Sequence, residues 1–124
     1  FVESQERAIV LLCEDPGTVE LVRRAVGRIH RVHGTDDPIE AALMVGDVRP
    51  DCFVIDMKLG GIDAIGFVQR IRSNGRFART QIVAWRGETN DSHEAMALDA
   101  GVNHYVTSVE GIEGLTARIR EGIA

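Results

Sequence analysis

Carboxylate side chains that follow two apolar runs are the groups in this chain best suited to chemistry. Asp56 follows the run 52–55 and precedes a glycine-rich segment, while Glu14 and Asp15 follow the run 8–13. Parallel α/β sheets bind ligands at the carboxyl ends of their strands. If the two runs form neighbouring strands, these carboxylates converge and repel one another unless a cation or protons neutralise them. The spacing therefore predicts a cation-binding site around Asp56.

The elements that would position these carboxylates alternate between strand-like and helix-like patterns. Short apolar runs predict buried strands, and apolar residues spaced three or four apart predict helices. Caps support the helices, because Asp37 precedes Pro38, and Asp91 with Glu94 resembles a capping box. The predicted strands are 8–13, 31–34, 52–56, 81–85 and 104–107, and the predicted helices are 16–29, 38–48, 65–71, 91–100 and 112–123.

The alternation of strands and helices predicts a parallel sheet that is covered by helices on both faces and joined by right-handed crossovers. A length of 124 residues suits a single domain with one sizeable core. The chain begins at Phe1 without an initiator methionine or a signal-peptide pattern. We therefore expect residues 1–124 to be one domain excerpted from a longer chain.

Composition and charge exclude several classes of function. The net charge of −5 argues against direct nucleic-acid binding by this domain, and no apolar run approaches the roughly 20 residues that a membrane span requires. Cys13 falls near the end of its predicted strand and Cys52 begins its own, which offsets them by roughly 10 Å. This offset exceeds the reach of a disulfide, and free thiols fit a reducing cytoplasm.

In the order of its motifs the chain resembles the receiver domain of bacterial response regulators, over nearly its whole length. Glu14 and Asp15 match the acidic pair that binds the metal ion in that family, and Asp56 matches the aspartate that accepts the phosphoryl group. Lys58 matches the position whose backbone carbonyl binds the metal. Tyr105, which ends a motif resembling the family's Ala-Gly-Ala-x-x-Tyr stretch, matches the aromatic residue that switches rotamer on activation.

The resemblance implies a flavodoxin-like, doubly wound (βα)5 fold with five parallel strands in the order 2-1-3-4-5. It implies phosphoryl transfer to Asp56, with Mg²⁺ held by Glu14, Asp15, Asp56 and the carbonyl of Lys58, in a signalling module that is not an enzyme. The implied partners are a sensor histidine kinase or phosphotransfer protein in the cytoplasm and an output domain on the same chain. A homodimer through the fourth helix, fifth strand and fifth helix is also implied.

Departures from the family pattern fall at the residues that read out the phosphoryl group. Arg86 stands where the family has Ser or Thr, and Ser108 and Val109 stand where it has Lys and Pro. In the loop after Asp56, Gly60 replaces a proline and Ala64 replaces a glycine. The acceptor and the acidic pair are therefore retained, while both groups that contact the phosphoryl group are lost.

These departures leave alternatives open. In the first, Arg86 supplies the lost positive charge and Ser108 adds a hydroxyl, so the domain still accepts a phosphoryl group. In the second, Arg86 pairs with Asp56, and the domain is a phosphorylation-independent pseudo-receiver that binds partners through Tyr105 and the 91–110 face. Enzymes of the same architecture fit poorly, because a flavin mononucleotide site needs a Ser/Thr/Gly phosphate loop and a haloacid-dehalogenase-type phosphatase needs an acid at Lys58.

Overall fold

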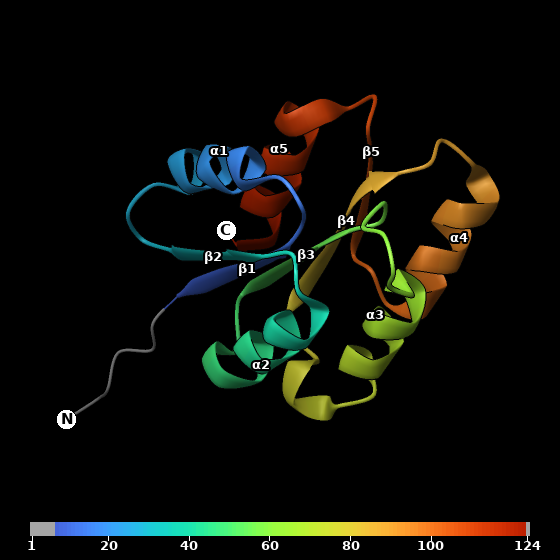
Figure 1. The fold of residues 1–124 in the computed structure, drawn as a ribbon, viewed down its shortest axis with the longest axis horizontal. Coiled ribbons are helices and arrows are strands. Elements are labelled where there is room, and N and C mark those ends of the chain that lie inside the picture. Colours follow the sequence, from blue (N-terminus) through green and yellow to red (C-terminus); the bar gives the residue numbers. More distant parts are fainter. Residues whose placement is uncertain (1–6, 124) are drawn as a thin grey trace.

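The computed structural model describes residues 7–123, which form a five-stranded parallel sheet in the order β2-β1-β3-β4-β5 (Figure 1). This is the predicted topology. The strands are β1 (Ala8–Leu12), β2 (Arg31–Thr35), β3 (Cys52–Asp56), β4 (Gln81–Gly87) and β5 (His104–Thr107). The helices are α1 (Pro16–Val26), α2 (Pro38–Val48), α3 (Ala64–Arg72), α4 (Asp91–Ala100) and α5 (Gly111–Ile123), with a 3-10 turn η1 at Gly75–Phe77.

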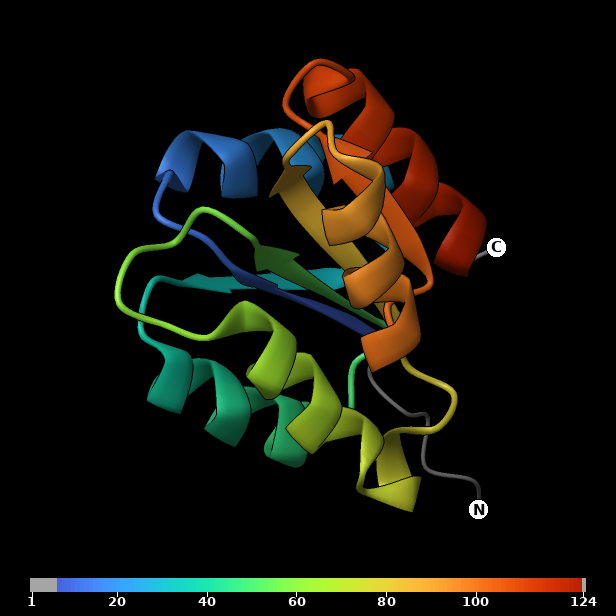
Figure 2. The same cartoon turned by 90° about the vertical axis from the view of Figure 1, so that its right-hand side faces the viewer.

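Helices cover both faces of the sheet, with α1 and α5 on one side and α2, α3 and α4 on the other (Figure 2). Alternate residues of β1 serve the two layers, since Val10 packs beneath α2 while Ile9 and Leu11 pack beneath α1 and α5. Burial on both faces explains why β1 and β3 read as continuous apolar runs. Among residues 7–123, no helix has the length and apolar character needed to cross a bilayer.

One predicted helix end and one predicted helix cap are wrong. The first helix ends at Val26, three residues before the predicted end, because Gly27 takes a left-handed φ of 75° that favours glycine. The predicted capping box is also wrong. The N-cap of α4 is Asn90, whose side chain accepts hydrogen bonds from the amides of Ser92 and His93, and Asp91 is already the first helical residue.

The cysteines lie in the core as free thiols, as predicted. In the β1–β3 register, Cys52 lies opposite Ile9. Cys13 is four residues beyond Ile9, so the two cysteines are not opposite each other. The pKa of Cys13 is raised to about 11 and that of Cys52 to about 12. Burial, which disfavours the charged thiolate, is the largest cause in both cases.

We predict that the unfolding free energy falls as the pH rises above ~9, because thiols in the unfolded chain ionise there while the folded thiols stay protonated. A raised folded-state pKa stabilises the protein below the unfolded pKa, and this contribution is lost on passing towards the folded value. Urea unfolding near pH ~8 and pH ~10.5 should show this loss, and the double variant Cys13→Ala/Cys52→Ala should lose less. Equal losses in the two proteins would contradict the assignment.

Candidate functional site

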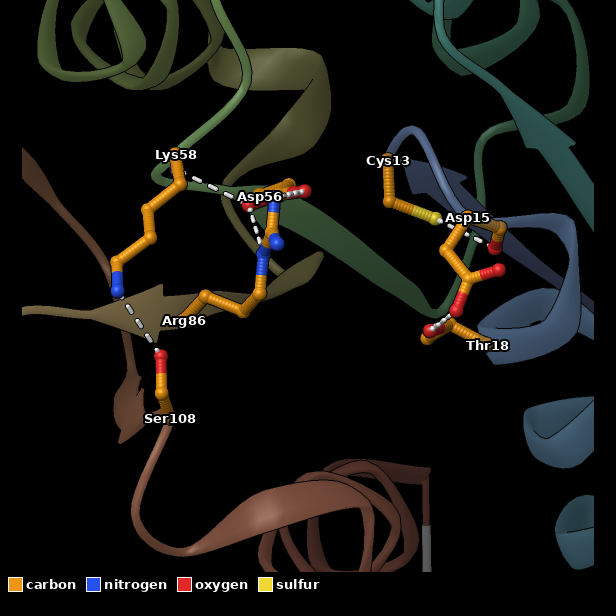
Figure 3. Close-up of polar contacts among 7 residues, drawn as sticks. All are labelled: Cys13, Asp15, Thr18, Asp56, Lys58, Arg86 and Ser108. Carbon is orange, nitrogen blue, oxygen red and sulfur yellow. Dashed lines mark hydrogen bonds and ion pairs between the residues drawn. The ribbon is translucent and has the colours of Figure 1, made fainter.

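Asp56 is buried at the carboxyl end of β3, and its carboxylate is held by a bidentate ion pair with Arg86 (Figure 3). The Arg86 Nε donates to Oδ1 at 2.9 Å and the Nη2 donates to Oδ2 at 2.7 Å. The backbone amide of Lys58 donates a further hydrogen bond to Oδ1 at 2.9 Å. Both carboxylate oxygens are therefore occupied. The side chain of Asp56 is only 2% exposed, whereas that of Arg86 is 35% exposed.

The backbone of β4 is distorted at the point where it delivers Arg86. Asp56 pairs with Trp85 in the β3–β4 register, so β3 and β4 are neighbours as predicted. Arg86 has a left-handed φ of 60°, and the β4–β5 register shifts between Ala84 and Gly87. A bulge of this kind re-aims a side chain, and a left-handed conformation costs a residue with a side chain about 1–2 kcal/mol. The ion pair is one interaction that offsets this strain.

The charges of the pair explain why it forms. An ionised carboxylate buried without a partner is strongly destabilising, and a planar guanidinium matches both of its oxygens at once. The hydrogen bonds to Asp56 raise the pKa of Arg86 above its ordinary value, so the guanidinium stays charged at any relevant pH. The repulsion expected around Asp56 is thus relieved by a cation that belongs to the chain itself.

Of the acidic pair after β1, the Asp15 side chain lies apart from Asp56, while the charge of Glu14 contributes to the raised pKa of Arg86. The carboxylate of Asp15 caps α1, accepting from the Gly17 amide at 2.9 Å and from the Thr18 hydroxyl at 3.1 Å. Figure 3 shows the Asp15 side chain turned towards Thr18, apart from the Asp56–Arg86 pair. Among the described residues, no group of three His, Cys, Asp or Glu side chains is placed to hold a metal ion. The Mg²⁺ site at Glu14, Asp15, Asp56 and the carbonyl of Lys58 stays a prediction.

Lys58, the only lysine of the chain, crosses the mouth of the site to Ser108. Its Nζ donates to the Ser108 Oγ at 3.2 Å, which joins the loop after β3 to the loop after β5. The sequence singled out Lys58 only for its backbone carbonyl and missed this contact. The available signal was the loss of a lysine at position 108 together with the presence of a single lysine two residues after Asp56.

Tyr105 on β5 lies against the same bulged end of β4. Its hydroxyl donates a hydrogen bond to the Glu88 carbonyl at 2.9 Å. Burial is the largest cause that raises the pKa of Tyr105, and the negative charges of Glu88 and Glu94 raise it further. A Cβ atom on Gly87 would lie 2.2 Å from Tyr105 Cζ, so only glycine admits the ring at this position. Sequence analysis did not single out Gly87. A cleft of about 190 Å³ adjoins the ring and is lined by Met57, Lys58, Ile65, Arg86, Glu88, His93, Met96 and Tyr105.

The chain belongs to the response regulator receiver domain family, whose pattern matches residues 10–120. The response regulator MprA of Mycobacterium leprae (strain TN) is 29% identical over 113 residues, which cover 90% of this chain and 49% of that protein. The chain thus spans about half the length of the curated relatives that it matches. It is a receiver domain of the kind found in two-component signalling.

Solved structures agree with the fold. A putative response regulator from Chloroflexus aurantiacus J-10-fl aligns with a TM-score of 0.80 at 21% identity, covering 95% of this chain and 98% of that one. The receiver domain of a sensor histidine kinase from Pseudomonas aeruginosa PAO1 aligns with a TM-score of 0.77 at 23% identity over the same shares of the two chains. That structure has a magnesium ion coordinated in its active site cleft.

We predict that Arg86→Ala lowers the unfolding free energy by roughly 2–4 kcal/mol, because a buried carboxylate loses its bidentate partner. Arg86→Gly loses the same pair but relieves the left-handed strain, so it should be about 1 kcal/mol more stable than Arg86→Ala. Urea unfolding followed by the fluorescence of Trp85, the single tryptophan, measures both. Adding Asp56→Asn to Arg86→Ala should recover part of the loss, and independent, additive effects would argue against the pair.

Proposed function

We propose that this receiver domain binds its signalling partner in the ion-paired state, without needing a phosphoryl group on Asp56. The observation that carries the proposal is the bidentate Asp56–Arg86 pair. It neutralises the acceptor from within the chain and occupies the oxygens with which Asp56 would attack. Of the two alternatives left open by the sequence, this geometry favours the pseudo-receiver.

The residues around the pair support the same conclusion. Phosphorylation would have to break both hydrogen bonds from Arg86 while the backbone of β4 stays bulged at that residue. No Ser or Thr hydroxyl stands at position 86 to close on a phosphoryl group, and Ser108 is too short to replace a lysine. A ligand shifts a conformational equilibrium only by its differential affinity for the two states. A phosphoryl group would therefore shift this domain little.

The partner-binding surface that we propose is the α4-β5-α5 face, which includes Tyr105 and residues 91–110. The Tyr105 side chain is held by its hydrogen bond to the Glu88 carbonyl. Its position on this surface therefore does not require a change of rotamer on phosphorylation. The partner would be a sensor histidine kinase, a phosphotransfer protein or an output domain on a longer chain in the cytoplasm. The length of the curated relatives supports an additional domain. Homodimerisation through this face remains a proposal from the resemblance.

Acceptance of a phosphoryl group on Asp56 is the second candidate function. Lys58 favours it, since its ammonium lies at Ser108, the position at which the family carries a phosphate-binding lysine. The acceptor itself lies at the expected strand end. The Mg²⁺ ion implied by the resemblance, held by Glu14, Asp15, Asp56 and the carbonyl of Lys58, stays a prediction.

Incubation with acetyl phosphate and Mg²⁺, followed by intact-mass spectrometry, distinguishes the two functions. We expect the wild-type chain to gain little or no phosphoryl mass and the variant Arg86→Thr/Ser108→Lys to gain one phosphoryl group. The reason is that the variant frees Asp56 and restores both readout residues. A β-branched threonine is poorly tolerated at a φ of 60°, so this variant should also return β4 to a regular strand.

The control adds Asp56→Asn to the restored variant and should abolish the mass gain. Amide chemical shifts of residues 91–110, recorded with beryllofluoride as a phosphoryl mimic, provide a second readout. We expect them to move in the restored variant and stay in place in the wild type. Wild-type labelling at the restored rate, together with equally large shifts, would overturn the proposal and establish the second candidate.

A further inference from the structure

Helix α2 is apolar on its outward side as well as on the side that faces the sheet. Ala41 and Val45 are fully buried against the core, whereas Ile39 is 72% exposed and Leu43 is 69% exposed. Ile39 and Leu43 are four residues apart, so they form one ridge along the outer face of the helix. Two large apolar side chains so exposed along one stripe of a helix are typical of a surface used for protein–protein contact.

An apolar groove runs beside this ridge, between α2 and α3, which lie alongside each other beneath the sheet in Figure 2. Its volume is about 1030 Å³. The small residues Ala42, Gly46 and Gly66 leave space between the two helices. The apolar lining of the groove includes Phe67 and Ile71. A ridge and a groove of similar chemistry thus lie side by side on one surface.

Opposite charges flank the ridge and the groove. Glu40 lies across the ridge from the groove and lines a separate hollow with Leu43, forming an acidic rim. Arg70 lines the groove itself, forming a basic rim. Asp47 and Arg76 belong to neither rim, because both line one hollow at the C-terminal end of α2. Within residues 7–123, no ion pair engages Glu40 or Arg70. Across the surface the order is acidic rim, ridge, groove, basic rim.

We propose that a second copy of this chain binds this surface in a two-fold dimer. A two-fold axis that lies in the interface and runs along α2 places each ridge in the partner's groove. The same operation brings each acidic rim onto the partner's basic rim. Two-fold interfaces must be self-complementary in this way, and the order of features across α2 and α3 satisfies the requirement in both shape and charge.

The α2–α3 dimer differs from the surface assigned to the signalling partner. None of the residues that line the groove belongs to α4, β5 or α5. Its formation requires neither a phosphoryl group nor a change at Asp56. The dimer would therefore present two copies of the α4-β5-α5 face at once.

Sedimentation equilibrium of the chain measures the mass across a dilution series, and we expect a shift from 13.6 kDa towards twice that mass as the concentration rises. Leu43→Asp should raise the dimer Kd by ~tenfold or more, because it places a charge on the ridge. Leu21→Asp is the matched control. Leu21 is exposed on α1, on the other side of the sheet, and its replacement should leave the Kd unchanged.

Charge reversal tests the arrangement of the rims. Glu40→Arg and Arg70→Glu should each be monomeric alone, since like charges then face each other twice. An equimolar mixture of the two variants should form a heterodimer, because every facing pair is attractive again. The control Arg24→Glu/Arg28→Glu alters exposed residues of and just after α1 and should dimerise like the wild type.

Circular dichroism and urea unfolding confirm that each variant is folded before its mass is compared. A wild-type chain that stays monomeric throughout the series would overturn the proposal. So would a dimer that survives Leu43→Asp, since its contact would then lie elsewhere. A mixture of the charge-reversed variants that remains monomeric would also overturn it.

Discussion

The carboxylate of Asp56 is buried at the end of β3, and burial of a negative charge demands a counter-charge within the same protein or from a bound ion. In this chain the counter-charge is the guanidinium of Arg86, which holds both carboxylate oxygens. This requirement also affects the backbone, because Arg86 itself has a left-handed φ and lies in a bulged part of β4. The conformation at the end of β4 is thus coupled to the charge state of the site.

The same distortion reaches the surface. Gly87 follows Arg86 in the chain and admits the ring of Tyr105, whose hydroxyl is bonded to the next residue, Glu88. The residue that neutralises Asp56 and the residue that admits the aromatic side chain are therefore covalent neighbours. In the function that we propose, this fixed arrangement replaces a phosphorylation-dependent link between Asp56 and the signalling face. Lys58 and Ser108 close the opposite side of the mouth.

The domain carries two surfaces with different physical character. The loops at the carboxyl ends of the strands gather charged and hydroxyl side chains, which are held by hydrogen bonds in fixed directions. The α2–α3 surface offers apolar area bordered by charge, which is suited to burial against a second protein surface. A receiver domain built in this way can bind through one surface without altering the other.

The sequence by itself determined the fold, because the periods of strands and helices and the strand-end positions of Asp56, Arg86 and Ser108 are local or topological properties. It also showed that Arg86 could pair with Asp56, but left other arrangements open. Only the tertiary structure decided between them. The direction of Arg86 depends on one backbone angle, and that of Asp15 depends on competition between capping α1 and joining Asp56. Contacts such as Lys58–Ser108 join residues fifty positions apart, and no local pattern encodes them.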